Sequence, residues 1–214
     1  MMINEIFYSI QGEGREMGLP TIFIRTTGCN LRCSYCDTRY AYEKGYEMTA
    51  EQIAIALKRF PCNRICLTGG EPLLQNEAGK MIRQLIGDGY EILVETNGSI
   101  GIRNFNTLAP GERRQLKVSL DIKCPCSGEE GKMNFSNIAE LKRQDQLKFV
   151  IGSRTDYDHA RNVLGKHLVS CPVYFNPVGG TDPKQLVKWV LEDGLNVHVG
   201  IQLHKIIWGE KRGV

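Results

Sequence analysis

Three cysteines, Cys29, Cys33 and Cys36, lie within eight residues of one another and carry the clearest chemical signal of the chain. Three thiolates on a short loop can bind three irons of a cubane iron–sulfur cluster and leave the fourth iron open. A closed electron-transfer cluster takes four cysteines, and a structural zinc site closes its tetrahedron with four protein ligands. The loop therefore predicts a cluster whose open iron does chemistry on a bound molecule.

Two glycine-containing segments could help to build a site around that cluster. The segment Thr68–Pro72 (Thr-Gly-Gly-Glu-Pro) follows a short apolar run, and its glycines would let backbone groups closely approach an amino acid head group. The segment Gln11–Gly14 (Gln-Gly-Glu-Gly) offers an amide and a carboxylate that could read the donor edge of a guanine-like heterocycle. A solvated turn is the alternative interpretation of this second segment.

Several single residues could also serve such a site. Arg25 lies within an apolar run, where an unpaired charge is costly, so it needs a substrate carboxylate or a protein carboxylate as its partner. Thr38, two residues beyond Cys36, could ligate magnesium or could cap a turn. Tyr35 could form a wall of a cofactor pocket or could pack on the loop. His204 is a candidate pocket-lining residue.

The composition limits the class of protein. With 214 residues, 42% of them hydrophobic and 24% charged, the chain suits one α/β domain with a sizeable core. A net charge of +3 is too small to indicate a nucleic-acid partner. No apolar run is long enough to span a membrane, and the first residues lack the pattern of a signal peptide. We therefore expect a cytoplasmic protein that binds neither nucleic acid nor membrane.

The chain has eight cysteines, an even number that invites a disulfide interpretation. The length of the chain and the lack of a secretion signal argue against it. Cys66 and Cys171 lie in or beside apolar runs and are expected to be buried, inert thiols. Cys124 and Cys126 are one residue apart and could bind a second metal, but a single pair is weak evidence.

Short apolar runs alternate with longer amphipathic stretches after the cysteine loop, which predicts parallel strands with helices packed outside them. The expected strands are 21–26, 65–67, 91–95, 116–122, 147–151, 173–176 and 197–201. The expected helices are 49–60, 76–87, 154–168 and 183–192, the first capped by Thr49 and Gln52. Roughly six strands after the loop are too few for a closed eight-stranded barrel. We expect a partial, open parallel β/α barrel, one core domain over 1–214 with short terminal extensions.

The polar motifs fall where the expected strands end. In parallel β/α barrels the carboxyl ends of the strands meet on one rim, and the active site lies there. The rim motifs are Thr68–Pro72, Glu95–Gly98, Asp121–Lys123, Asn176–Pro177 and Gln202–Lys205. Their common placement predicts a single site beside the cysteine loop.

The cysteine spacing, with Tyr35 before the last cysteine, and the Gly-Gly-Glu-Pro turn at 69–72 together resemble the radical S-adenosylmethionine superfamily. In that superfamily the open iron binds the amino and carboxylate groups of S-adenosylmethionine. An electron from the cluster then cleaves it to methionine and a 5′-deoxyadenosyl radical, which abstracts a hydrogen atom from the substrate. The resemblance implies a [4Fe-4S] cluster bound by Cys29, Cys33 and Cys36.

A narrower resemblance, to the 7-carboxy-7-deazaguanine synthase family, spans nearly the whole chain. It rests on Glu5–Gly14, Phe23–Leu31, Cys36–Thr38 and the rim motifs. It implies a carbon–nitrogen lyase that converts 6-carboxy-5,6,7,8-tetrahydropterin to 7-carboxy-7-deazaguanine with loss of ammonia, on the way to queuosine or archaeosine. It also implies magnesium, a homodimer, and an electron donor such as flavodoxin or ferredoxin.

The same resemblance implies the roles of individual residues, and it makes no side chain the primary hydrogen abstractor. The implied pterin contacts are Ile10, Gln11, Gly12, Glu13, Arg25, Thr68 and His204. The implied S-adenosylmethionine contacts are Tyr35, Cys36, Asp37, Gly70, Asp121, Ile122, Lys123, Asn176, Pro177, Val178 and Gly179. Thr38 is the implied magnesium ligand.

Two features depart from the family pattern. Members often end soon after the His-Lys segment, whereas this chain runs on through Trp208–Val214, and the family pattern does not include the pair Cys124 and Cys126. A solvated tail is the simplest interpretation of the basic residues near the end, Lys205, Lys211 and Arg212. Two other functions stay open, namely a radical enzyme that activates a glycyl-radical partner protein and a zinc- or cluster-binding interaction module.

Overall fold

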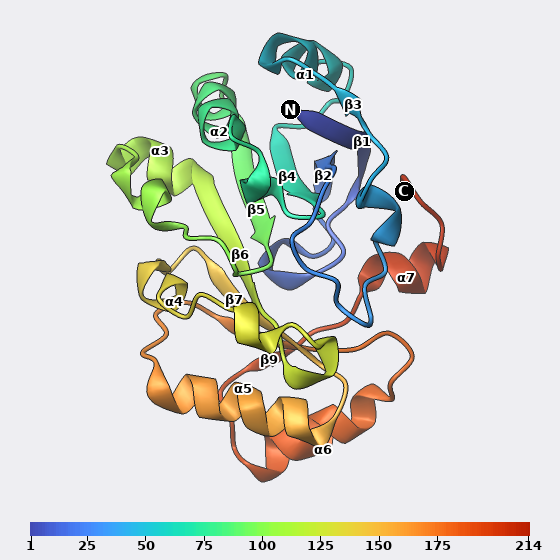
Figure 1. The fold of residues 1–214 in the computed structure, drawn as a ribbon, viewed down its shortest axis with the longest axis vertical. Coiled ribbons are helices and arrows are strands. Elements are labelled where there is room, and N and C mark those ends of the chain that lie inside the picture. Colours follow the sequence, from blue (N-terminus) through green and yellow to red (C-terminus); the bar gives the residue numbers. More distant parts are fainter.

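One nine-stranded β-sheet forms the centre of the protein (Figure 1). The computed structural model describes all of residues 1–214. The strands are β1 (Met2–Ile10), β2 (Pro20–Thr26), β3 (Tyr46–Glu47), β4 (Arg64–Gly69), β5 (Glu91–Thr96), β6 (Leu116–Ile122), β7 (Gln146–Ile151), β8 (Val173–Pro177) and β9 (His198–Val199). Their order is β3-β1-β2-β4-β5-β6-β7-β8-β9. Neighbours from β2 to β9 are parallel, whereas β1 pairs antiparallel with β2 and β3.

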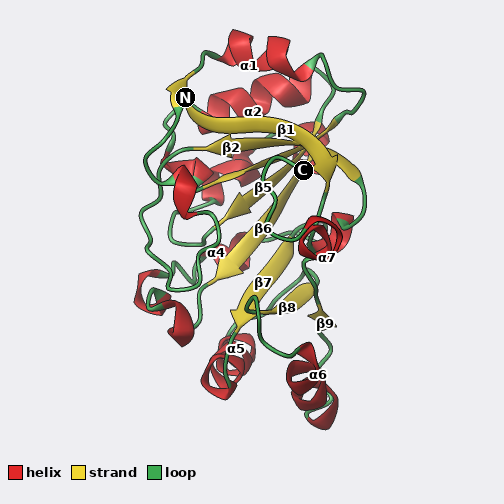
Figure 2. Ribbon diagram, turned by 90° about the vertical axis from the view of Figure 1, so that its right-hand side faces the viewer, coloured by secondary structure: helices red, strands yellow, loops and turns green.

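The sheet is open, because β3 and β9 are free edges, and Figure 2 shows its strands twisting from β1 to β9. It is the predicted partial parallel barrel, with β4 to β9 as the six strands expected after the cysteine loop. β6 has the predicted bounds. β1 and β3 were not predicted, because β1 mixes apolar residues with Asn4, Glu5 and Ser9 and is mostly half-buried, which hides a strand periodicity.

Seven α-helices accompany the sheet. They are α1 (Ala50–Leu57), α2 (Ala78–Gly87), α3 (Pro110–Gln115), α4 (Asn137–Glu140), α5 (Arg154–Lys166), α6 (Pro183–Glu192) and α7 (Leu203–Trp208). The predicted capping box of α1 is present, since Thr49 Oγ1 accepts from Gln52 N at 3.2 Å and Gln52 Oε1 accepts from Thr49 N at 2.9 Å. α6 begins and ends as predicted. No helix has both the length and the apolar character needed to cross a membrane.

The two faces of the sheet bury different side chains. The outer face packs against the helices in one large apolar core, which includes Ile24, Leu67, Val94, Leu120 and Phe149. The inner face carries a small apolar layer of Phe23, Cys66 and Leu93, which are neighbours in register. Side chains alternate along strands, so Arg25 and Glu95 are the next inward positions toward the carboxyl ends of β2 and β5. The inner face is therefore polar at the predicted rim.

Figure 1 shows α2, α3 and α5 around the left and lower sides of the sheet, and α7 with the C-terminus on the right. α7 follows the last strand and returns to the loop after β1, where Leu203 N donates to Gly12 O at 2.9 Å. The C-terminal segment thereby lies beside the N-terminal strand pair, on the inner side of the open sheet.

Candidate functional site

A cavity of about 710 Å³ lies over the polar part of the inner face, at the carboxyl ends of the strands. All five rim motifs contribute to its wall, so the structure brings them together as predicted. The predicted residues that line it are Ile10, Gln11, Gly12, Glu13, Arg25, Cys29, Cys33, Tyr35, Cys36, Asp37, Thr38, Thr68, Gly70, Asp121, Lys123, Asn176, Pro177, Val178, Gly179 and His204. Ile122 does not line it, because its side chain is fully buried in the outer-face core.

The three loop cysteines line one part of this cavity. Burial raises the pKa of Cys33, and the neighbouring thiols of Cys36 and Cys29 add to this, as expected where the three sulfurs face one space. Two N–H groups point at Cys29 Sγ, the Leu31 backbone N at 3.4 Å and Asn97 Nδ2 at 3.7 Å. Hydrogen bonds to cysteine sulfur are among the features that set the potential of an iron–sulfur cluster.

The donor set of the cysteine loop bears on the kind of metal centre that it could hold. A cubane cluster binds each thiolate to a different iron, so three thiolates leave its fourth iron open. A structural zinc site takes four protein ligands. The three thiolates of Cys29, Cys33 and Cys36 therefore suit a [4Fe-4S] cluster with one open iron.

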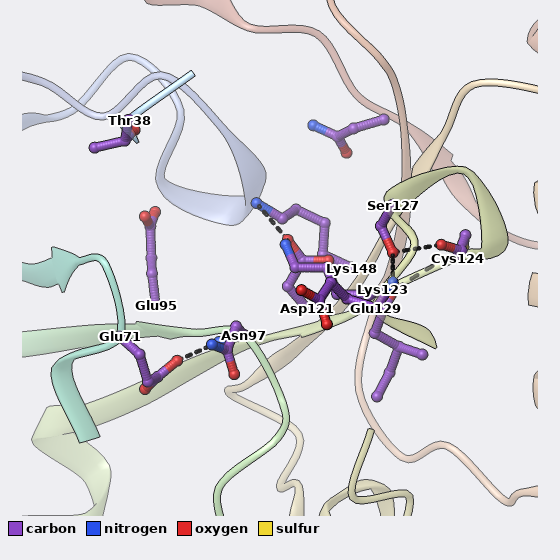
Figure 3. Close-up of polar contacts among 12 residues, drawn as sticks. Thr38, Glu71, Glu95, Asn97, Asp121, Lys123, Cys124, Ser127, Glu129 and Lys148 are labelled. Carbon is purple, nitrogen blue, oxygen red and sulfur yellow. Dashed lines mark hydrogen bonds and ion pairs between the residues drawn. The ribbon is translucent and has the colours of Figure 1, made fainter. Parts of the chain in front are cut away.

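The Gly-Gly-Glu-Pro turn packs closely against the cluster loop and is hydrogen-bonded to it. A Cβ added at Gly70 would lie 2.0 Å from Gly28 O, so only glycine permits this approach. Glu71 N donates to the same oxygen at 2.8 Å. The Glu71 side chain is fully buried and accepts from Thr96 Oγ1 at 2.9 Å. It also accepts from Asn97 N at 2.7 Å (Figure 3). Its carboxylate thus ties β4 to the end of β5 and does not face the cavity.

Three buried polar atoms near the cluster loop and the ends of β6 and β8 have no protein partner. They are Tyr35 Oη, Asp121 Oδ1 and Asn176 Oδ1. Buried polar atoms are normally hydrogen-bonded, so these three are positions that a polar ligand would complete. The other oxygen of Asp121 accepts from Lys123 Nζ at 2.8 Å. Unpaired acceptors and a hydroxyl suit S-adenosylmethionine, which carries an ammonium group and ribose hydroxyls.

Three polar side chains form a second hydrogen-bonded group at the cavity: Thr68 of β4, Glu95 of β5 and Gln11 of the loop after β1. Glu95 Oε2 accepts from Thr68 Oγ1 at 3.0 Å, and Glu95 Oε1 accepts from Gln11 Nε2 at 3.3 Å. Gln11 Oε1 in turn accepts from Gly12 N at 2.7 Å. The Gln11 amide therefore holds its own loop against β5. Glu95 was noted on the rim but was not predicted as a site residue.

Arg25 has the protein partner that was one of its two predicted alternatives. Its Nε lies 2.8 Å from Glu5 Oε1, which also accepts from Tyr40 Oη at 3.0 Å. Burial opposes the charge of Arg25, yet Tyr40 and Glu5 raise its pKa. Arg25 also lines the cavity, so the guanidinium is held in place while it borders the space in which a substrate would lie.

The glycines of the Gln-Gly-Glu-Gly segment make room for partners from distant parts of the chain. A Cβ at Gly12 would lie 2.0 Å from His204 Nδ1, so this glycine allows the start of α7 to reach the cavity. Gly14 has φ of +69°, and a Cβ there would lie 2.3 Å from Gln146 Nε2. The segment is therefore packed against other parts of the chain, and the solvated-turn interpretation is wrong.

The solvated-tail interpretation is also wrong for Lys205. Its Nζ lies 3.0 Å from Asp37 Oδ2, beside the last cluster cysteine. Burial opposes the charge of Asp37, yet Lys205 holds the pKa of that carboxyl below its usual value. Lys211 and Arg212 are exposed but border the cavity, and the Arg212 guanidinium lies 3.8 Å from the centre of the Tyr40 ring. Aromatic and acidic partners at the rim explain why this basic tail folds back.

Thr38 also borders the cavity, and its hydroxyl donates to Asp37 Oδ1 at 3.0 Å. Two adjacent oxygen donors are a minimal protein contribution to a magnesium site, since Mg²⁺ keeps several waters and substrate oxygens among its ligands.

Cys126 lies outside the cavity; its backbone N donates to Asp156 at 2.8 Å, and burial raises the pKa of its thiol to about 12.

Lys148 was not predicted as a site residue, but it lines the cavity from β7. The signal was available, because Lys148 interrupts the apolar run 147–151 just as Arg25 interrupts the run 21–26. A cation on the inward side of a buried strand requires partners there. Gln202 was noted on the rim but was not predicted as a site residue; its Nε2 donates to Glu13 Oε1 at 2.7 Å.

Comparison with known proteins gives consistent matches. Residues 23–123 match the family model described as the radical SAM superfamily. A 7-carboxy-7-deazaguanine synthase of Koribacter versatilis is 38% identical over 100% of both chains. One of Thermoplasma acidophilum is 37% identical over 100% of both chains, and one of Methanospirillum hungatei is 40% identical over 97% of this chain and 85% of the relative.

Solved structures share the fold. The crystal structure of QueE from Escherichia coli matches with a TM-score of 0.77 and covers 95% of this chain and 94% of that chain, at 21% identity. The structure of Streptococcus suis SuiB bound to S-adenosylmethionine matches with a TM-score of 0.54 over 82% of this chain and 48% of that chain, at 10% identity. These likenesses show the same partial-barrel architecture.

The cysteine geometry predicts which thiols bind iron. After anaerobic reconstitution we expect about four irons per chain in the wild type and loss of the cluster in Cys33→Ala. Cys126→Ala is the matched control and should keep the wild-type iron content, because Cys126 does not line the cavity and its thiol lies beside Gly152 and Asp156. Iron and sulfide analysis with the visible absorption spectrum measures this. Equal iron loss in both variants would contradict the assignment.

The burial of Glu71 predicts a structural role. In Glu71→Gln an amide group replaces one acceptor and faces an N–H of Leu73 or Asn97, so the free energy of unfolding should fall by about 1–3 kcal/mol. Urea unfolding of cluster-free protein measures it. The exposed Glu77→Gln on the same connection is the control and should change stability little. A Glu71→Gln variant as stable as wild type would refute the role.

Proposed function

The chain belongs to the 7-carboxy-7-deazaguanine synthase family of radical S-adenosylmethionine enzymes, and we propose that it converts 6-carboxy-5,6,7,8-tetrahydropterin to 7-carboxy-7-deazaguanine with loss of ammonia. Two observations support this proposal. Three such synthases are 37–40% identical to this chain over 97–100% of its length, and one cavity is lined by both the three-cysteine loop and all five rim motifs. The cluster and S-adenosylmethionine supply, when bound, the radical that abstracts hydrogen from the substrate.

S-Adenosylmethionine is proposed to lie along the ends of β4, β6 and β8, beside the cysteine loop. The Gly70 backbone borders this region closely, and the unpaired atoms of Tyr35, Asp121 and Asn176 offer hydrogen bonds. Lys123 neutralises Asp121 and so keeps that carboxylate ionised as an acceptor. The remaining proposed contacts to this molecule are Cys36, Asp37, Lys123, Pro177, Val178 and Gly179, all of which line the cavity.

The carboxy-pterin is proposed to lie against the loop after β1 and the ends of β2, β4 and β5. Arg25 would pair with the substrate carboxylate from its position beside Glu5. Carboxylate and amide oxygens nearby suit the amino and ring N–H groups of a pterin. The proposed contacts are Ile10, Gln11, Gly12, Glu13, Arg25, Thr68 and His204, all of which line the cavity.

The proposal also includes a magnesium site, an oligomeric state, a cellular location and an electron donor. We place Mg²⁺ at Thr38, where it would orient the substrate carboxylate. The enzyme is proposed to act as a homodimer in the cytoplasm, with one core domain over 1–214, and to take its electron from a flavodoxin or ferredoxin. The product feeds 7-deazapurine synthesis, toward queuosine or archaeosine.

Turnover tests the proposal directly. Reconstituted protein with S-adenosylmethionine, a reductant and the carboxy-pterin should form ammonia and the deazaguanine chromophore, and no partner protein should be needed. Cys33→Ala is the control and should form none of them. If 5′-deoxyadenosine forms only with a partner protein that gains a glycyl radical, the activating-enzyme alternative is correct instead.

The magnesium assignment makes a separate prediction. Thr38→Val removes the hydroxyl ligand while keeping the side-chain shape, so the Mg²⁺ concentration for half-maximal turnover should rise several-fold. Thr38→Ser restores the hydroxyl and should restore the wild-type requirement. Steady-state rates over a magnesium titration measure this. An unchanged requirement in Thr38→Val would remove Thr38 from the metal site.

A further inference from the structure

Lys148 is a largely buried cation that lines the cavity, and the function proposed above gives it no role. It lies on β7 directly beside Asp121 of β6 in the parallel register. Its side chain is 16% exposed. A lysine in this position is costly unless carboxylates compensate it, so its partners show what holds it there.

Lys148 contacts one carboxylate from each half of the proposed site. Its Nζ lies 3.1 Å from Glu13 Oε2 and 3.6 Å from Asp121 Oδ2. Glu13 belongs to the proposed pterin side, and Asp121, with its unpaired Oδ1, belongs to the proposed S-adenosylmethionine side. Figure 3 shows Lys148, Asp121 and Lys123 close together. The ammonium group therefore lies between the two binding regions.

Lys148 and the carboxylates around it stabilise one another's charged forms. Burial alone would lower the pKa of Lys148, but Glu13, Asp121 and Glu95 raise it well above its usual value. Burial would likewise raise the pKa of Asp121, but Lys123 and Lys148 keep it low. The lysine thus stays charged and shares that charge among several carboxylates.

Glu13 accepts hydrogen bonds from two other side chains besides its contact with Lys148. The strength of the Lys148–Glu13 contact can therefore change when a ligand binds Glu13. Gln202 Nε2 donates to Glu13 Oε1 at 2.7 Å, and Asn176 Nδ2 donates to Glu13 Oε2 at 3.3 Å. A ligand whose N–H groups bind Glu13 would satisfy part of its charge. Lys148 could then turn from Glu13 toward Asp121, where its present distance is the longer of the two. Asp121 would thereby be better held as an acceptor.

We propose that Lys148 is a positioning residue that couples the two ligands, so that the carboxy-pterin bound at Glu13 tightens the binding of S-adenosylmethionine at Asp121. This inference rests on the proposed function for the identity of both ligands. Coupling is reciprocal, so S-adenosylmethionine tightens pterin binding by the same factor. The device favours binding of both molecules together over binding of S-adenosylmethionine alone.

Binding in the absence of reductant tests this without turnover. Anaerobic calorimetry on the reconstituted enzyme gives the dissociation constant of S-adenosylmethionine with and without saturating carboxy-pterin. We expect the pterin to lower it by about fivefold or more in the wild type, the usual lower range of coupling between sites. In Lys148→Met the ratio should fall to about one, and Lys148→Arg, which keeps the charge, should recover part of it.

Lys117→Met is the matched control. Lys117 lies on the adjacent strand β6, is 26% exposed and also contacts two carboxylates, Glu16 and Glu91, but it does not line the cavity. Its removal should leave the coupling ratio at the wild-type value. Iron content and thermal unfolding check that each variant is folded, and Lys148→Gln replaces Lys148→Met if the latter does not hold its cluster.

The outcomes separate this inference from the proposed function. If wild type binds S-adenosylmethionine but no carboxy-pterin, the proposed function fails and the inference fails with it. If wild type binds both with coupling and Lys148→Met keeps the same ratio, only the role of Lys148 is overturned. An equal loss of affinity with and without pterin in Lys148→Met also overturns it, because that result marks a purely structural residue.

Discussion

The need to neutralise charges on the inner face of an open sheet governs the rest of this structure. Arg25 and Lys148 point inward from strands whose outer faces belong to the main apolar core. Each is compensated by a carboxylate of the N-terminal segment, Arg25 by Glu5 and Lys148 by Glu13. A buried pair returns its desolvation cost only when both members stay in place. The antiparallel strand β1 and its following loop are therefore as necessary to the site as the parallel strands.

The same constraint explains the position of the C-terminal segment. An open sheet leaves one side of its inner face unprotected, and β9 ends the sheet without closing it. α7 covers part of this opening, with His204 packed against Gly12 and Lys205 paired with Asp37. The C-terminal segment thus contacts both the loop after β1 and the end of the cluster loop. Electrostatic interactions are stronger where water is excluded, so this cover also strengthens the charge pairs beneath it.

The features that the sequence predicted well are local ones. The cysteine loop, the α1 capping box and the bounds of β6 depend on neighbouring residues and on apolar runs. The rim motifs came together because parallel strands place their carboxyl ends on one edge. Two features were missed because they depend on pairing across the chain: β1 needs β2, and Lys205 needs Asp37. No local pattern encodes those partners.

Glu71 and Glu95 show why residue type alone does not assign function. Both are carboxylates that follow or end a buried strand, and both were visible as rim residues. Glu71 lies in the turn after β4, which is hydrogen-bonded to the cluster loop at Gly28. Its carboxylate accepts hydrogen bonds from Thr96 and Asn97 and is not available to a ligand. Glu95 occupies an inward position of β5, two residues after Leu93, and stays within the cavity. The strand register therefore decides which carboxylate faces a ligand and which one holds the scaffold together.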